Sequence, residues 1–347
     1  MKYESLDSIL ERAREILSAQ ENTLPKILLK EILTNSLKLK EEDLDTLDLK
    51  VINRAFRELR YAFKVFKPYR GIRKVSIFGS ARLPEEDPHY QQTVKFARML
   101  ANEGFMVITG AASGIMKAGN EGAGKGKSFG VNILLPFEQS PNEFIVDDPK
   151  LMTFKYFFTR KLLFVMESCA IVLLPGGYGT HDEGFETLTL VQTEKASPRP
   201  VVLMDLPGES YWEEWDAFVK DQLLGRGFIS REDISLYKIV YSAEEAIDEI
   251  KFFFSTYHSM RQVGDRHVIR LERELTDDNV DELNKSFKDV LEKGKFEKTY
   301  ALPGEVNEPE LLRMPRLVFS YNYKSAGRIR QLIDRINEMG RSLGDEV

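Results

Sequence analysis

Hydrophobic residues in the first part of the chain recur at the spacing of helices. Leu6–Leu17 and Ile52–Phe66 each place their hydrophobic residues on one helical face. Pro25 stands where a helix between them would begin. The pattern therefore predicts a helical N-terminal extension over residues 1–72. We expect it to serve packing or dimerisation rather than chemistry.

The middle of the chain, residues 73–255, alternates between short hydrophobic runs and longer amphipathic segments. The runs predict strands at 75–78, 105–108, 129–135, 170–174 and 200–204. The amphipathic segments predict helices around 94–100, 157–168, 183–195 and 211–224. Strands that alternate with helices are typical of a parallel sheet covered on both faces. The pattern favours a Rossmann-like, doubly wound α/β domain.

The last region, residues 256–347, predicts a separate small α/β domain. Period-two alternation predicts strands at 267–271 and 317–323, and helical spacing predicts helices at 280–291 and 329–336. The pattern does not indicate what this region does. Packing, oligomerisation and regulation all stay open.

The composition is that of a soluble globular protein, with 42% hydrophobic and 30% charged residues. A net charge of −6 gives no reason to expect a nucleic acid polymer or an anionic membrane as partner. No apolar run approaches the roughly 18 residues that a membrane span needs, and Met1–Ser5 lacks the profile of a signal peptide. The single cysteine, Cys169, has no partner for an internal disulfide. These features lead us to expect a cytoplasmic protein.

The glycine-rich segment Pro175–Glu183 follows the predicted strand 170–174 and precedes a predicted helix. The free backbone N–H groups at a helix N-terminus attract anions, and glycines let the backbone approach a phosphate closely. We expect Thr180 to cap the helix and Glu183 to lie in its first turn. A plain tight turn is the alternative, but so many glycines beside a cap and an acid favour an anion site. The expected phosphate-binding residues are Gly176, Gly177, Tyr178, Gly179 and Thr180.

Two more predicted strands end in glycine-containing turns, at Gly79-Ser80 and at Gly110–Gly114. Ligands of parallel sheets bind at the carboxyl ends of the strands, so the three turns converge on one pocket if their strands are neighbours. We expect the sugar and base to be lined by Gly79, Ser80, Gly110, Ser113 and Gly114. Weaker candidates for substrate binding are Asn120, Glu186 and Thr189.

Other kinds of site fit the sequence poorly. Gly110–Gly114 lacks the G-x-G-x-x-G spacing of a dinucleotide site. The segment Gly119–Lys125 lacks the Ser or Thr of a P-loop and precedes a strand. The four histidines have no metal-ligand spacing, so we expect no metal site. His181, inside the glycine turn, is open to two interpretations: recognition of base or sugar, or simple exposure.

Several motifs resemble those of the cytokinin-activating phosphoribohydrolases, the LONELY GUY family, whose members were long mislabelled as lysine decarboxylases. Pro175–Glu183 resembles the family's PGGxGTxxE signature, although His181 stands where many members carry an apolar residue. Four more segments resemble family motifs in the family order: Ser76–Ala81, Thr109–Met116, Asn132–Gln139 and Phe158–Lys161. The resemblance extends over residues 73–255.

The resemblance implies an enzyme that hydrolyses the N-glycosidic bond of a nucleoside 5′-monophosphate, AMP or N6-substituted AMP, without a cofactor. Because positive charge develops on the sugar as the bond breaks, a carboxylate is required, and the resemblance assigns this role to Glu183. It implies that Arg160 acts beside Glu183 and keeps it ionised. Lys161 is expected to pair with phosphate.

Composition alone would place Arg160 and Lys161 in solvent. A pyridoxal-phosphate decarboxylase would need a Schiff-base lysine, and Lys161 is the only lysine expected at the pocket. The resemblance also implies at least a homodimer. A non-catalytic nucleotide-binding or regulatory module, or a structural assembly protein, remains the alternative.

Overall fold

The computed structural model describes residues 5–18, 23–136, 140–305 and 308–342. By its internal contacts the chain divides into two compact units, Met1–Arg60 and Tyr61–Val347. The boundaries expected from the sequence, at 72/73 and 255/256, stay predictions. One motif of the sequence reaches beyond the described part, since Phe137–Gln139 lie outside it.

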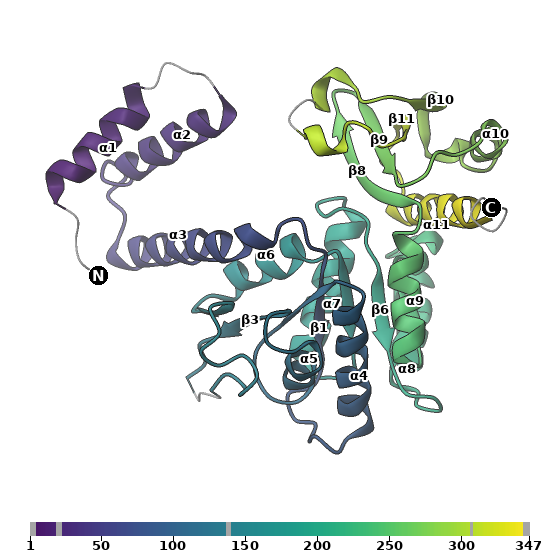
Figure 1. Ribbon diagram of the computed structural model, residues 1–347, viewed down its shortest axis with the longest axis horizontal. Helices are drawn as coiled ribbons and strands as arrows, with labels where there is room; N and C mark the ends of the chain where they lie inside the picture. Colours follow the sequence, from purple (N-terminus) through teal and green to yellow (C-terminus); the bar gives the residue numbers. More distant parts are fainter. Residues whose placement is uncertain (1–4, 19–22, 137–139, 306–307, 343–347) are drawn as a thin grey trace. The chain divides into compact units, whose positions relative to one another are not determined.

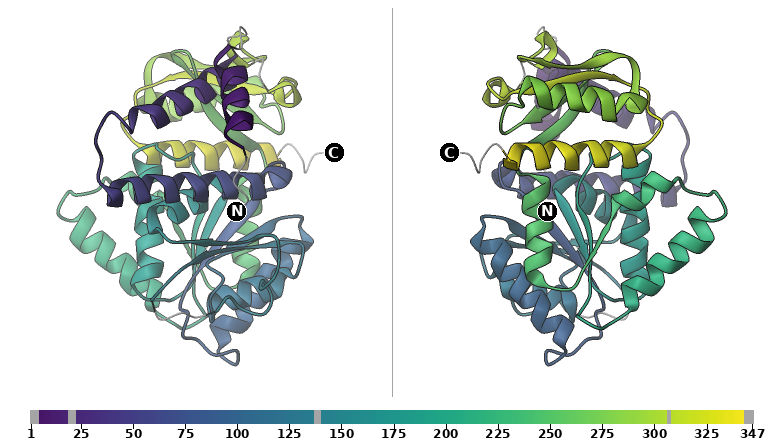
Figure 2. Two further views of the ribbon diagram at one scale, coloured as in Figure 1. Left: turned by 90° about the vertical axis from the view of Figure 1, so that its left-hand side faces the viewer. Right: turned by 90° about the vertical axis from the view of Figure 1, so that its right-hand side faces the viewer.

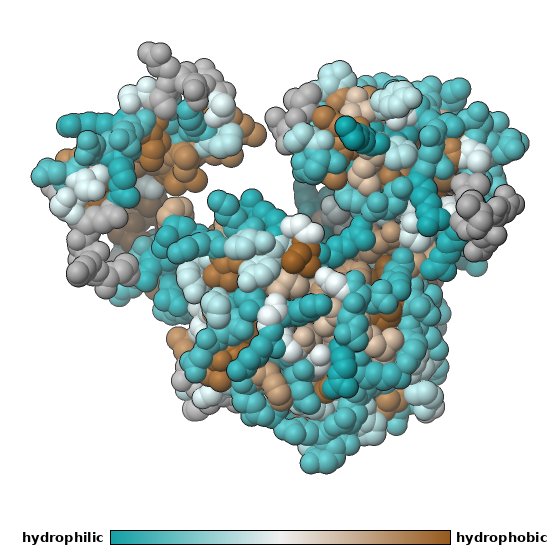
Figure 3. Space-filling view, viewed as in Figure 1, coloured by the Kyte–Doolittle hydropathy of each residue, from teal (hydrophilic) through white to brown (hydrophobic). Residues whose placement is uncertain are grey.

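The first unit is helical, which confirms the prediction for this region. It contains α1 (Leu6–Ser18), α2 (Leu24–Lys38) and the larger part of α3 (Thr46–Phe66). Pro25 lies in the first turn of α2, where its missing N–H leaves no helical bond unmade. These helices leave much of their hydrophobic surface exposed, as the brown side chains on them in Figure 3 show.

The second unit contains a seven-stranded parallel sheet, and the Rossmann-like α/β fold is thereby confirmed (Figure 1). The strand order is β4-β3-β2-β1-β5-β6-β7. The strands are β1 (Lys74–Phe78), β2 (Met106–Thr109), β3 (Ser128–Ile133), β4 (Leu151–Phe154), β5 (Ala170–Leu173), β6 (Val201–Met204) and β7 (Lys238–Val240).

Helices cover both faces of this sheet, as the two side views of Figure 2 show. Consecutive strand residues face opposite sides, so Ile77 packs in one hydrophobic cluster and Phe78 in the other. The first face carries α4 (Pro88–Asn102), α5 (Ile115–Ala123) and α9 (Ala243–Phe253). The second carries α6 (Phe157–Glu167), α7 (Tyr178–Gln192) and α8 (Tyr211–Phe218).

A second, antiparallel sheet follows, with the order β10-β11-β9-β8. Its elements are β8 (Tyr257–Val263), β9 (Arg266–Leu271), α10 (Asp277–Ser286), β10 (Leu291–Thr299), β11 (Arg316–Tyr321) and α11 (Ala326–Ser342). The sequence predicted β9, β11 and both helices but neither β8 nor β10. β10 alternates poorly because most of its side chains are exposed at the edge of the sheet.

Short 3-10 or π turns complete the second unit. They are η1 (Lys67–Tyr69), η2 (Val219–Leu224), η3 (Arg231–Leu236), η4 (Lys288–Val290), η5 (Pro303–Glu305) and η6 (Pro309–Leu311). The helix predicted over 211–224 therefore ends as an α-helix at Phe218 and continues as the π turn η2. Among the described residues, no helix is both long enough and apolar enough to cross a bilayer.

Candidate active site

The candidate site lies where the parallel sheet reverses its winding direction. β1 pairs with β2 on one side and with β5 on the other, so the turns that follow these strands adjoin. Between them opens a cavity of about 720 Å³. Eight of the expected site residues line it: Gly79, Ser80, Arg160, Gly176, Gly177, Tyr178, Gly179 and Thr180.

Helix α7 begins earlier than the sequence predicted, at Tyr178 instead of residue 183. Its N-cap is Gly177, so the expectation that Thr180 caps the helix is wrong. Glu183 accordingly lies in the second turn, not the first. Two glycines at the helix start hid its beginning, because glycine is a poor helix former. The first N–H groups of α7, those of Tyr178 and Gly179, have no acceptor within the helix.

The two glycine turns are in close contact. Ser80 N donates to the Pro175 carbonyl over 3.1 Å. A Cβ on Gly176 would lie 2.2 Å from Thr180 Oγ1 and 2.9 Å from Ser80 N, so no larger residue fits there. Gly114 has φ +62°, and a Cβ on it would lie 2.3 Å from the Ser80 carbonyl. The glycines therefore let the turns pack together and leave the start of α7 open to the cavity.

Arg160 and Glu183 are two charged residues of the site that influence each other electrostatically. Arg160 comes from α6 and lines the cavity, and its Nε is buried without a hydrogen-bond partner. Glu183 is only 3% exposed. Burial raises its pKa to about 7, against the opposing effects of the Arg160 and Lys161 charges. The Arg160 charge does lower the pKa of Glu183, as expected, but burial raises this pKa by more. The expectation that Arg160 keeps Glu183 ionised is therefore wrong.

Lys161 does not reach the cavity. Its ammonium pairs with Asp182 at 2.8 Å and with Glu186 at 2.7 Å, both on α7. The pairs join α6 to the helix that carries Glu183. The ammonium group that was expected to bind phosphate is therefore already paired with two carboxylates.

A hydrogen-bonded pair of rings supports the glycine turn from behind. Tyr211 OH donates to the Gly176 carbonyl, and His181 Nε2 lies 2.7 Å from the same hydroxyl. Since that hydroxyl proton is engaged, His181 donates from Nε2. Burial lowers the pKa of His181, which keeps its ring neutral. His181 lines the cavity and is neither fully exposed nor free to turn.

The other expected residues, Glu183 among them, lie outside the cavity lining. A Cβ on Gly110 would lie 3.7 Å from Arg160 Nη2, which places the third turn beside the arginine. Ser113 donates to the Ala81 carbonyl and so holds the first turn. Asn120 is fully buried and bonds to Thr109 and Asn142. Thr189 is exposed, about 13 Å farther along α7 than Thr180.

Three functional candidates were missed in the sequence. Arg82 and Met116 line the cavity, and Tyr211 holds the Gly176 carbonyl. Arg82 had a signal, since it lies two residues after Ser80, next to a turn already singled out. Tyr211 had none, because it approaches the turn from a helix 30 residues beyond His181.

No group of three His, Cys, Asp or Glu residues in the described ranges is arranged to hold a metal ion.

Comparison with known proteins adds one family. The family model described as "Possible lysine decarboxylase" matches residues 108–250. This match covers β2 to α9 of the parallel-sheet domain and less than half of the chain. No curated protein matches the chain significantly.

Solved structures of similar fold include two molybdenum-cofactor proteins. The cofactor carrier protein from Chlamydomonas reinhardtii is 20% identical over 52% of this chain and 96% of its own, with a TM-score of 0.37. The cofactor binding protein from Rippkaea orientalis is also 20% identical, over 52% and 94%, with a TM-score of 0.37. DNA processing protein A from Helicobacter pylori is 18% identical over 51% and 79%, with a TM-score of 0.35. At these identities the likeness concerns the fold alone.

Proposed function

We propose that this protein hydrolyses the N-glycosidic bond of a nucleoside 5′-monophosphate, with adenine or an N6-substituted adenine as the base. The products are the free base and ribose 5-phosphate. The family match over residues 108–250 and the motif resemblance both support this reaction class. The observation that carries the proposal is Arg160, which lines the cavity with a donor unused, together with Glu183, a buried carboxyl group whose pKa feels the arginine charge and is raised by burial to about 7.

The phosphate binds at the start of α7 in this proposal. The N–H groups of Tyr178 and Gly179 point from the positive end of the helix, and Arg160 and Arg82 supply two cations at the cavity wall. Binding the phosphate fixes the far end of the substrate and orients the sugar carbon that reacts.

Glu183 acts on the reacting carbon. Breakage of the glycosidic bond leaves positive charge on the sugar ring, which an ionised carboxylate stabilises. The same carboxylate takes the proton of the attacking water, while the departing base carries away the bonding electron pair and takes up a proton from solvent. A carboxyl group with a pKa near 7 is suited to such proton transfer at neutral pH. Glu183 must be ionised to act, so turnover rises with pH through this pKa.

The geometry disfavours the decarboxylase activity that the family description suggests. Pyridoxal-phosphate chemistry needs a lysine that reaches the cofactor. Among the described residues, none of those that line the cavity is a lysine. Lys161, the nearest candidate in the sequence, pairs with Asp182 and Glu186.

A homodimer through α6 is part of the proposal. Phe158, Leu162 and Met166 recur every four residues and are 55%, 43% and 57% exposed. They share a helix with Arg160, so a second subunit on this face would lie close to the site. Light scattering of purified protein tests this point, and Met166→Glu is expected to shift a dimer to monomer.

The test of the reaction is to incubate the purified protein with nucleoside monophosphates, nucleosides and triphosphates and to follow free base by chromatography. We expect free base to be released from monophosphates only. Nucleosides lack the phosphate that binds at the glycine turn, and the chain of three phosphates in a triphosphate is too long for that turn. Glu183→Ala and Arg160→Ala are expected to abolish it. Base release that survives both variants would contradict the assignment. Stabilisation by monophosphates without base release would instead establish a non-catalytic nucleotide-binding module.

A further inference from the structure

A second cavity, of about 450 Å³, lies between the end of α7 and the antiparallel sheet. The loop Thr193–Pro198 forms one wall, and β8 and β9 form another. The start of α11 closes it, through Ala326 and Ile329. Its volume is within the range of small-molecule sites, roughly 300–1,000 Å³. The proposed reaction uses none of these residues.

His267 gives this cavity a binding group without a partner. The ring is 5% exposed, lines the cavity, and has a buried Nδ1 without a hydrogen-bond partner. A buried polar atom left unpaired costs about 1–3 kcal/mol, and a hydrogen bond to an occupant of the cavity would remove that cost. Burial lowers the pKa of His267, so the ring is neutral and offers one donor and one acceptor.

Aromatic rings surround His267. Tyr323 lies 5.1 Å from it at an interplanar angle of 78°, and Tyr321 lies 5.4 Å from it at 80°. Tyr323 lines the cavity, is 54% exposed and has a left-handed backbone, with φ 56°. Glu194, on the opposite wall, has φ 58°. Left-handed residues other than glycine are strained and gather at ligand sites. The wall favours a flat ring as the occupant.

The charges at the cavity favour an anion. Lys195 and Arg261 line it, and α11 begins there at Ala326 with the positive end of a 17-residue helix. Glu194 is the one carboxylate among the described lining residues, and its oxygen accepts a hydrogen bond from Tyr321.

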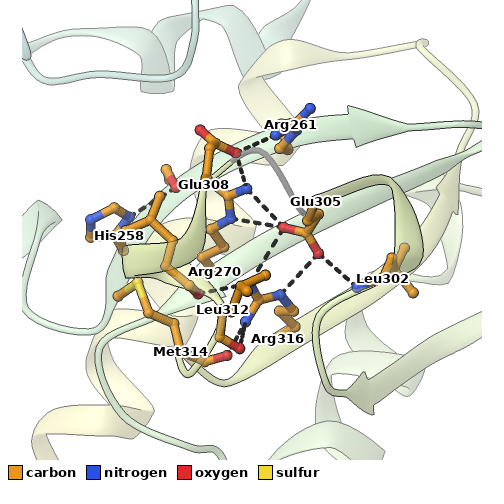
Figure 4. Close-up of polar contacts among 11 residues, drawn as sticks. His258, Arg261, Arg270, Leu302, Glu305, Glu308, Leu312, Met314 and Arg316 are labelled. Carbon is orange, nitrogen blue, oxygen red and sulfur yellow. Dashed lines mark hydrogen bonds and ion pairs between the residues drawn. The ribbon is translucent and has the colours of Figure 1, made fainter.

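Arg261 belongs to a wider network of charges, in which it pairs with Glu308. Arg261, Arg270 and Arg316 share two carboxylates, those of Glu305 and Glu308 (Figure 4). Three guanidinium groups against two carboxylates leave one positive charge in excess.

From these observations we infer that the cavity between α7 and the antiparallel sheet binds a small planar molecule that carries an anionic group. The ring lies against Tyr323 and His267, and the anion meets Lys195, Arg261 and the start of α11. Since α7 ends at this cavity and begins at the glycine turn, one helix joins the two sites.

The experiment measures thermal unfolding of the full chain with four probes: phenyl phosphate, benzoate, phenol and inorganic phosphate. We expect phenyl phosphate or benzoate to raise the Tm by about 2–4 °C at ten times its Kd. The one that acts identifies the anion. Phenol lacks the anionic group and inorganic phosphate lacks the ring, so both are expected to have little effect on the Tm.

Three variants separate this cavity from the glycine turn. Lys195→Gln changes an exposed charge, and His267→Phe keeps the ring while it removes the unpaired nitrogen. Both are expected to lose the shift, and His267→Phe is expected to keep or raise the Tm without ligand. Arg160→Gln is expected to retain the shift. A shift lost only in Arg160→Gln, or kept in both His267→Phe and Lys195→Gln, or absent with all four probes, would overturn the inference.

Discussion

Two groups of arginine and glutamate in this protein, each with a buried glutamate, have opposite chemistry. In the antiparallel sheet, Glu305 accepts bonds from Arg270 at 2.8 Å, from Arg316 at 3.0 Å and from Leu302 N at 3.0 Å (Figure 4). Burial opposes its ionisation, but these donors lower the pKa of Glu305 to about 2. At the switch point of the parallel sheet, Glu183 has its pKa raised to about 7, and Arg160 Nε lacks a partner.

The difference separates structural charges from functional ones. A buried charge with all its hydrogen bonds made contributes to the fold and has nothing left to offer a ligand. A buried charge with donors unused and a pKa near neutrality is suited to binding and catalysis. Variants of both groups test this contrast.

Glu183→Gln is expected to lower turnover of a nucleoside monophosphate by about 10³-fold, because it removes the proton acceptor. Glu186→Gln on the same helix is the matched control, since the carboxylate of Glu186 pairs with Lys161. Chromatographic assay of free base measures both variants. Equal losses in the two variants would remove the special role of Glu183.

The same variant is expected to be more stable than the natural protein at pH 8. The folded pKa of Glu183, about 7, lies above the ordinary 4.5, so the unfolded chain loses this proton first as pH rises. Stability therefore falls between these values, and Gln removes a cost on the order of 3 kcal/mol above pH 7. At pH 4 Glu183 is protonated in the folded and in the unfolded chain alike, so Glu183→Gln is expected to give no gain in stability. Thermal unfolding at the two pH values checks the sign.

Glu305→Gln is expected to destabilise the fold by about 3–5 kcal/mol, because two buried guanidinium groups lose their counter-charge. Glu308→Gln, whose carboxylate is 36% exposed, is the milder control. Chemical denaturation measures both, and base release below the unfolding transition is expected to persist. A Glu305→Gln protein that stays stable but releases no base would contradict this, because Glu305 would then serve the reaction and not the fold.

Arg160→Gln is expected to move the pH midpoint of the residual turnover upward, because the arginine charge lowers the pKa of Glu183. Lys161→Gln acts in the same direction with a smaller shift, since Lys161 is the weaker of the two cationic influences. The pH dependence of kcat/KM measures both. A downward shift in Arg160→Gln would mean that the arginine does not act on Glu183.

Tyr211→Phe has the smallest expected effect. It removes the donor to the Gly176 carbonyl and the partner of His181, so the glycine turn loosens and KM rises about 3- to 10-fold. Tyr241→Phe is the control, because its hydroxyl bonds to Glu213 on the surface. Steady-state kinetics of the two variants distinguishes a role in the turn from a general loss of stability.

The sequence predicted the central fold and the glycine turns well, for physical reasons. Buried parallel strands are continuous apolar runs, so β1, β2, β5 and β6 were readable directly. The glycine turns were readable because few other residues tolerate such close backbone contacts. Edge strands such as β10 escaped prediction, since their exposed side chains carry no hydrophobic pattern.

The chemistry of the site was less predictable. Whether Glu183 is ionised depends on burial by residues distant in the sequence, and spacing says nothing about that balance. The partners of Lys161 lie one helix away, on α7, and Tyr211 reaches Gly176 from α8. These contacts arise only when the helices pack.

The central claim is that Glu183 carries a proton near neutral pH while Glu305 does not. Carbon-13 NMR of the glutamate carboxyl groups tests it most directly, with the Glu183 signal assigned by its absence in Glu183→Gln. We expect a titration midpoint near 7 for Glu183 and near 2 for Glu305. A Glu183 midpoint near 4.5, the ordinary value, would show that its carboxyl group is not set apart from a surface glutamate and would contradict the account.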